Sequence, residues 1–143
     1  QLGRIAETGI SESMLKQYCQ KLGGSGNLVL MLDACYSGRM KFDELIRELG
    51  TDDYRVVAMA SSKGDEVSLE NPRWRGGAFT RAICEGLEGH ADSGMYANKI
   101  VEHDELDVHV KRAVPILTDY QQHPLTNALY LGCDRPIALT QVP

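Results

Sequence analysis

The chain has 143 residues, of which 43% are hydrophobic, and its 15 Lys and Arg face 20 Asp and Glu for a net charge of −5. This length fits one domain, and the absence of a basic excess disfavours nucleic-acid binding as the main role. The longest apolar runs, residues 28–32 and 56–60, are far shorter than the ~20 residues of a membrane span, and no signal-peptide pattern opens the sequence, so we expect a cytoplasmic protein without a membrane partner.

Apolar residues recur at helical spacing in four stretches and form two short continuous runs. The helical stretches are 11–22, for which Ser11 is the expected N-cap, 42–49, 79–87 and 106–117; the runs 28–32 and 56–60 predict strands buried on both faces. Residues 61–77 are polar and contain several Gly and Pro, which predicts a long loop, and residues 125–139 hold one or two strands of weaker signal. This alternation is typical of an α/β sandwich with parallel strands.

The four cysteines, at positions 19, 35, 84 and 133, have no CxxC spacing, so a zinc site or a dense disulfide framework is not expected. Cys19 and Cys84 fall on apolar helical faces and are predicted to be core residues, whereas the position of Cys133 is ambiguous. Cys35 differs from them because it follows a buried strand within a turn that contains Ser37 and Gly38.

Ligands of α/β sheets bind beyond the carboxyl ends of the strands, where this sequence places residues 33–38 and 61–65. A cysteine in such a turn can be exposed, and a nucleophilic thiol needs exposure together with a base or a positive field. The alternative is that Cys35 is buried as a small hydrophobic residue.

Asp33-Ala34-Cys35-Tyr36-Ser37-Gly38 resembles the nucleophile motif of metacaspases and bacterial caspase-like peptidases. Residues 60–68, 77–80 and 122–124 are similar to later elements of that family, in the same order, so the resemblance covers most of residues 10–140. It implies a caspase-like three-layer sandwich with a mostly parallel sheet. It also implies a peptidase in which the Cys35 thiolate attacks the peptide carbonyl and a histidine protonates the leaving amine.

The histidine of that dyad has no counterpart in this sequence. In caspases it lies about 50 residues before the cysteine, whereas only 34 residues precede Cys35 and none is a histidine. The histidines at 90, 103, 109 and 123 all follow it, and we expect them to be solvated or locally hydrogen-bonded. We therefore expect residues 1–143 to be the carboxyl-terminal part of one caspase-like domain, without its first strands, and a separate N-terminal fragment to supply the histidine.

Asp33 lies two residues before the nucleophile, where the resemblance implies an acid in the specificity pocket of metacaspases. A carboxylate there would select a protein or peptide substrate with Arg or Lys before the cut. The alternative is that Asp33 caps its own turn. Asp65 is the expected second acid, and Glu66 and Glu70 are expected to be solvated.

Other residues after the second strand are candidates for substrate contact. Ser61 and Ser62 are expected to line the cleft through their backbone. Trp74, the single tryptophan, either walls a substrate groove or packs on the edge of the core. We expect no cofactor; calcium stays open, although Asp43, Asp52 and Asp53 lack the spacing of a calcium loop.

Two other functions compete with the peptidase. A catalytically inactive caspase-like module would bind or regulate a partner. An unrelated α/β hydrolase with a cysteine nucleophile would place His123 or another histidine of this chain within hydrogen-bond reach of Cys35.

Overall fold

The computed structural model describes residues 9–22, 26–35, 37–49, 54–95, 97–129 and 137–142 as a mixed α/β fold. The helices are α2 (Glu12–Leu22), α3 (Phe42–Leu49), α4 (Ala78–Glu85) and α5 (His103–Leu117), with short turns η2 (Ser37–Arg39), η3 (Pro72–Trp74) and the π-helical η4 (Gly86–His90). The strands are β1 (Gly26–Leu32), β2 (Tyr54–Ala60), β3 (Glu70–Asn71), β4 (Gly76–Gly77), β5 (Ile100–Glu102), β6 (Leu125–Leu129) and β7 (Ala138–Gln141).

The main sheet has the order β1-β2-β6. β1 and β2 are parallel, in a register that runs from Gly26 opposite Tyr54 to Leu32 opposite Ala60, whereas β2 and β6 are antiparallel. The pairs β3–β4 and β5–β7 are also antiparallel. Parallel pairing therefore does not predominate among the described strands, and the mostly parallel sheet stays a prediction.

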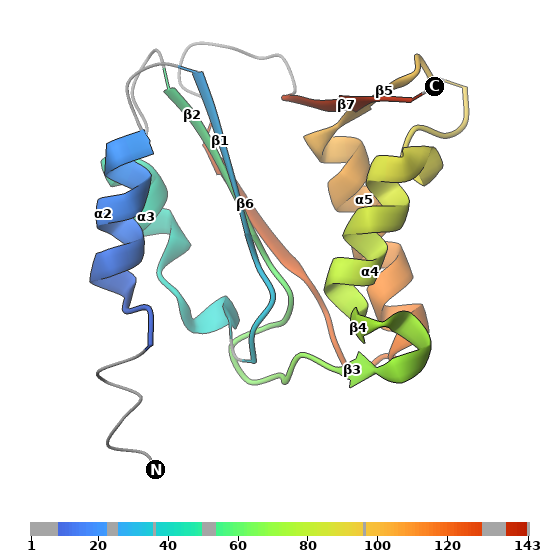
Figure 1. Cartoon of the computed structure of the whole chain (residues 1–143), viewed down its shortest axis with the longest axis horizontal. Helices are drawn as coiled ribbons and strands as arrows, with labels where there is room; N and C mark the ends of the chain where they lie inside the picture. Colours follow the sequence, from blue (N-terminus) through green and yellow to red (C-terminus); the bar gives the residue numbers. More distant parts are fainter. Residues whose placement is uncertain are drawn as a thin grey trace.

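The two faces of β2 pack against different helices (Figure 1). Val57 and Met59 belong to the core cluster formed with α4 and α5. Val56, Ala58 and Ala60 belong to the cluster that contains Cys19 of α2 and Ile46 of α3. This division follows from the two-residue period of a strand, and it confirms that the run 56–60 is buried on both faces.

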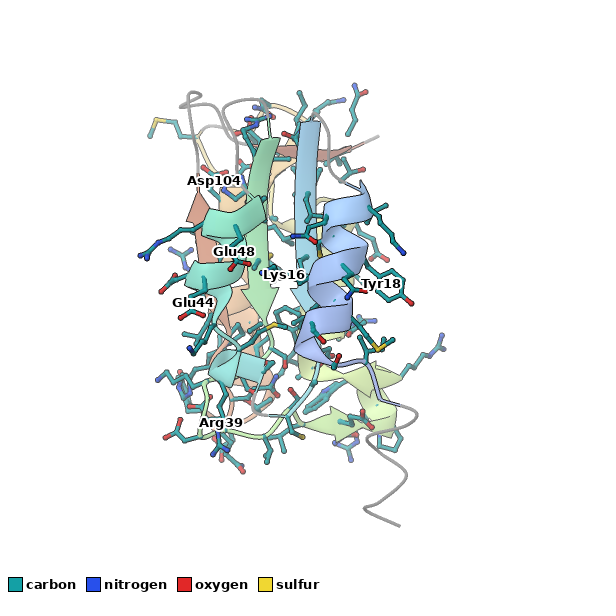
Figure 2. The ribbon with its side chains drawn as sticks, turned by 90° about the vertical axis from the view of Figure 1, so that its left-hand side faces the viewer. Lys16, Tyr18, Arg39, Glu44, Glu48 and Asp104 are labelled. Atoms are coloured by element: carbon teal, nitrogen blue, oxygen red, sulfur yellow. The ribbon has the colours of Figure 1, made fainter. Side chains whose placement is uncertain are left out.

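The outer helices α2 and α3 behave as their apolar spacing predicts. The main-chain N–H of Met14 donates to the hydroxyl of Ser11 at 3.2 Å, so Ser11 caps α2 as expected. Cys19 is buried, as predicted. An ion pair between Lys16 and Glu48 joins the two helices, while the ring of Tyr18 lies on the side of α2 that faces away from α3 (Figure 2).

Three expectations about local structure need correction. The run 28–32 lies in β1 but is half-buried, because β1 has a single neighbour in the described sheet. The stretch 61–77 is not wholly loop, because it contains the β3–β4 hairpin closed around η3. Cys84 is exposed and not part of the core: it lies one turn after the exposed Thr80 on the outer side of α4.

The weak signal at 125–139 corresponds to two strands, of which β6 joins the main sheet and β7 pairs with β5. Cys133 lies outside the described residues. No helix in the described ranges is long and apolar enough to cross a membrane.

Candidate active site

The candidate nucleophile lies just beyond the end of β1. Cys35 is exposed, and its thiol donates a long hydrogen bond of 3.9 Å to the carbonyl oxygen of Ser68 in the loop after β2. The parallel pairing of β1 and β2 brings these two strand ends together, because the carboxyl ends of parallel strands meet at one edge of a sheet. The structure therefore places the thiol at the sheet edge where the sequence predicted chemistry.

Ser61 supports the turn that carries Cys35. Its hydroxyl accepts the main-chain N–H of Ala34 at 3.2 Å and donates to the carbonyl oxygen of the same residue at 3.1 Å. It also lies within hydrogen-bond distance of the hydroxyls of Ser37 and Ser68. These contacts hold the backbone on the N-terminal side of Cys35 against the end of β2.

Ser62 and Gly38 hold the C-terminal side of the same turn. The N–H of Ser62 donates to the Ser37 hydroxyl at 3.3 Å, and the N–H of Gly38 donates to the carbonyl of Ser62 at 2.9 Å. A Cβ at Gly38 would lie 2.7 Å from that carbonyl oxygen, so glycine is required here by close backbone approach. Ser61 and Ser62 have no exposed surface; the expected lining of a cleft is therefore corrected to support of the nucleophile turn.

A second layer of contacts fixes the loop after β2, and sequence reasoning missed it. The buried side chain of Gln122 donates to the carbonyl of Ser61 at 2.8 Å and accepts the N–H of Leu69 at 2.8 Å. The hydroxyl of Thr118, at the end of α5, accepts the N–H of Gln122 at 3.2 Å. The similarity of residues 122–124 to a family element marked the position of this glutamine, but nothing local to it revealed its partners.

Glu66 and His123 join the same two segments. Glu66 accepts the main-chain N–H of His123 at 2.7 Å, and its other oxygen lies 2.8 Å from the imidazole Nδ1. Burial by itself would raise the pKa of Glu66, but hydrogen bonds from the main chain and imidazole of His123 and the main chain of Lys63 lower that pKa below its usual value. The expectation that Glu66 is solvated is therefore wrong.

Asp33 is exposed, and its carboxylate contacts the N-terminal turn of α4. Thr80 donates to Oδ2 twice, from its hydroxyl at 2.6 Å and from its main-chain N–H at 3.3 Å. Gly77 is so close that a Cβ there would lie 2.3 Å from the same oxygen. Asp33 thus caps a neighbouring helix and not its own turn, while its place in a specificity pocket stays a prediction.

Among the described residues, neither Asp65, Glu70 nor Trp74 hydrogen-bonds to Asp33, whose two donors both belong to Thr80. Asp65 is exposed in the turn after β2, and Glu70 is exposed at the start of β3. Trp74 is half-buried and packs against the core cluster of α4 and α5, which agrees with the core-edge alternative and leaves part of the ring accessible.

No histidine of this chain hydrogen-bonds to Cys35, and all four lie in the described ranges. The imidazole of His123 binds Glu66. His103 is buried and accepts the N–H of Ile137 at Nδ1, and burial lowers its pKa. The rings of His90 and His109 stack at a centroid distance of 6.5 Å. The α/β-hydrolase alternative, which required a histidine at the thiol, is therefore not supported.

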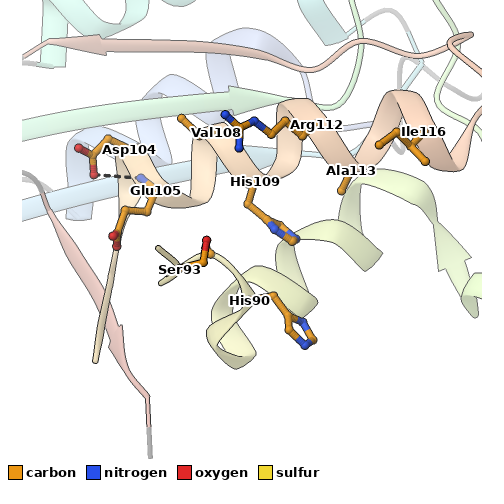
Figure 3. A pocket seen from close by; sticks show the side chains of 10 residues that line it. His90, Ser93, Asp104, Glu105, Val108, His109, Arg112, Ala113 and Ile116 are labelled. Atoms are coloured by element: carbon orange, nitrogen blue, oxygen red, sulfur yellow. Dashed lines mark hydrogen bonds between the residues drawn. The ribbon is translucent and has the colours of Figure 1, made fainter. Parts of the chain in front are cut away.

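A groove of about 480 Å³ lies between α5 and η4, and none of the residues of the nucleophile turn lines it (Figure 3). His109 reaches into it from α5, and its buried Nε2 has no hydrogen-bond partner among the described residues. A smaller apolar pocket of about 310 Å³ adjoins the nucleophile turn and is lined by Ile10, Ser11, Leu15, Leu32, Ala34, Ser37 and Met40. Within the described residues, no three His, Cys, Asp or Glu side chains are grouped to hold a metal ion; Asp52 and Asp53 fall outside them.

Cys35 is an exposed cysteine beyond a parallel strand, on a turn supported by polar side chains from the adjacent strand end, and it meets the exposure that a thiol nucleophile needs. The family model of the caspase domain matches residues 4–131, so the chain belongs to this family, which is one of cysteine peptidases. Searches of the curated proteins and of the solved structures gave no match.

Proposed function

We propose that this protein is a cytoplasmic cysteine endopeptidase that cleaves proteins after Arg or Lys, with Cys35 as the nucleophile. The observation that carries the proposal is the exposed thiol of Cys35 on a rigidly supported turn, with the carboxylate of Asp33 two residues before it. Membership of the caspase domain family supports the reaction class.

The proposed reaction has two steps. The Cys35 thiolate attacks the scissile carbonyl, a C–S bond forms, the C–N bond breaks, and an imidazolium gives its proton to the leaving amine. Water, deprotonated by the same imidazole, then attacks the thioester and releases the acid. The main-chain N–H of Cys35 is the proposed first donor to the oxyanion.

Specificity in this proposal comes from acids beside the nucleophile. Asp33 receives the basic side chain, Asp65 is the second acid, and the accessible part of the Trp74 ring borders the substrate. Ser61 and Ser62 contribute by holding the turn, since both are fully buried.

The histidine of the dyad is proposed to come from an N-terminal fragment of the same domain. One edge of β1 has no partner in the described sheet, although this seven-residue strand is apolar from Leu28 to Leu32. Such an edge favours the addition of a further strand. That strand would extend β1-β2-β6 toward the three-layer, mostly parallel caspase-like sheet, with residues 1–143 as its carboxyl-terminal part.

The test is covalent labelling with an arginyl chloromethyl ketone, followed by intact and peptide mass measurement. Labelling is compared in the presence and absence of the N-terminal fragment. An adduct on Cys35, with none from the aspartyl analogue and none in Cys35→Ala, is the expected result. Cys84→Ala is the matched control, because Cys84 is the other exposed thiol among the described cysteines. Equal labelling of Cys35 and Cys84 would contradict a specific site.

A non-catalytic caspase-like module is the second candidate. It is favoured by one observation, that none of the four described histidines hydrogen-bonds to the thiol. Iodoacetamide distinguishes the two candidates: modification of Cys35 by this small reagent, with no arginyl adduct even when the N-terminal fragment is present, would favour the module.

A further inference from the structure

The contact between Asp33 and α4 is asymmetric. Both donors of Thr80, the hydroxyl and the main-chain N–H, bind the same carboxylate oxygen, Oδ2. Among the described residues, Oδ1 has no hydrogen-bond partner. Gly77 has an ordinary extended backbone (φ −73°, ψ 146°), so what requires glycine there is the closeness of the carboxylate and not the conformation.

The alternation of side chains along β1 explains why Asp33 reaches α4. Along β1, Val29 and Met31 pack on the core cluster of α4 and α5, whereas Leu30 and Leu32 pack on the cluster of α2 and α3. Continuing this alternation beyond Leu32 turns Asp33 toward α4. The N-terminus of α4 carries a partial positive charge and has no side-chain cap of its own, so a carboxylate is stabilised there.

Each carboxylate oxygen offers about two lone-pair directions for hydrogen bonds. Thr80 occupies both directions on Oδ2, which leaves Oδ1 as the acceptor for a ligand. An arginine that binds a carboxylate bidentately needs both oxygens, whereas a lysine ammonium needs only one.

We propose that Thr80 is a positioning residue for substrate recognition: by occupying Oδ2 of Asp33 it presents Oδ1 alone to the basic side chain. An arginine then cannot bind Asp33 bidentately, and this carboxylate binds Arg and Lys side chains with similar affinity. The inference rests on the proposed function, because it assumes that Asp33 receives the substrate cation.

The test compares Thr80→Val with Thr80→Ser. Valine keeps the size of the side chain but removes the hydroxyl donor, which frees one direction on Oδ2; serine keeps the donor. Thr126→Val is the matched control, because it removes a Thr-to-Asp hydrogen bond, to Asp107, away from the site.

The readout is the ratio of affinities for N-acetyl-arginine amide and N-acetyl-lysine amide, measured by NMR titration of the full chain carrying Cys35→Ala. This measurement requires neither the dyad histidine nor catalysis. We expect a ratio within a few-fold of one for the Cys35→Ala parent, Thr80→Ser and Thr126→Val. For Thr80→Val we expect a rise of about tenfold in favour of arginine, which corresponds to one added charge-assisted hydrogen bond or about 1.4 kcal/mol.

An unchanged ratio in Thr80→Val, an equal loss of affinity for both amides, or no binding of either amide would overturn the inference. The outcome is separable from that of the labelling experiment. If the ratio shifts but Cys35 is never labelled by the arginyl reagent, the peptidase proposal fails while the role of Thr80 in cation recognition stands.

Discussion

Replacing Gln122 by leucine tests whether the hydrogen bonds of Gln122 to Ser61 and Leu69 are a major source of stability. The side chain is fully buried and makes two hydrogen bonds of 2.8 Å, to the carbonyl of Ser61 and from the N–H of Leu69. Leucine has a similar volume but leaves both backbone groups unpaired, at about 1–3 kcal/mol for each buried group. Because Leu69 is only half-buried, we expect a loss of about 3 kcal/mol in the free energy of unfolding, or roughly 10 °C in melting temperature.

The measurement is urea and thermal unfolding, with Gln121→Leu as the control because that neighbouring side chain is exposed. Amide hydrogen exchange at Ala34, whose N–H is held by Ser61, should speed up in Gln122→Leu and not in the control. A loss below about 1 kcal/mol, or equal losses in the two variants, would refute the argument that Gln122 organises this region.

Three further predictions concern packing and pH. Gly38→Ala should cost about 1–3 kcal/mol of unfolding free energy, because the new Cβ would lie 2.7–2.8 Å from main-chain atoms. Gly64→Ala should cost less, because its Cβ would meet the flexible side chain of Arg39 at 3.0 Å. A larger loss of stability in Gly64→Ala than in Gly38→Ala would contradict this packing. The lowered pKa of Glu66 means that its contribution to stability is present above about pH 4.5 and is lost as the pH falls through the folded-state pKa, so Glu66→Gln should flatten the acid limb of a stability curve. Burial also lowers the pKa of His103, so its contribution to stability is full above about pH 6.5 and falls as the pH decreases. His103→Asn should therefore reduce the slope of the free energy of unfolding against pH between pH 7.5 and 5.5. An unchanged slope would argue against the burial of His103.

The sequence predicted the elements whose signal is local. The apolar run 56–60 and the helical spacing at 42–49 correspond to β2 and α3, and Ser11 caps α2 as expected. Cys84 shows where spacing misleads, because a cysteine in a mixed helix fits either face, and the true core face of α4 is the one with Phe79, Ala82 and Ile83.

In the candidate site, too, local features could be predicted from the sequence and long-range contacts could not. The exposed turn with Cys35 and Asp33 could be predicted because it follows a strand directly. The partners of this turn could not, since Thr80, which binds Asp33, and Ser61, which binds Ala34, lie 45 and 26 positions after Cys35 in the sequence. A serine or threonine in a polar segment carries no mark that distinguishes a solvated hydroxyl from one that binds a distant backbone.

The direction of β6 is what brings the last part of the site together. β6 is antiparallel to β2, and Leu125, its first residue, is paired with Ala60, the last residue of β2. The residues just before β6 therefore lie beside the residues just after β2, which is why Gln122 meets Ser61 and His123 meets Glu66. If β6 were parallel to β2, residues 122–124 would lie at the opposite end of the sheet, near the start of β2 at Tyr54. The antiparallel strand that departs from the expected parallel pairing is thus the one that fastens the loop supporting the nucleophile, and its direction carries no signal in the local sequence.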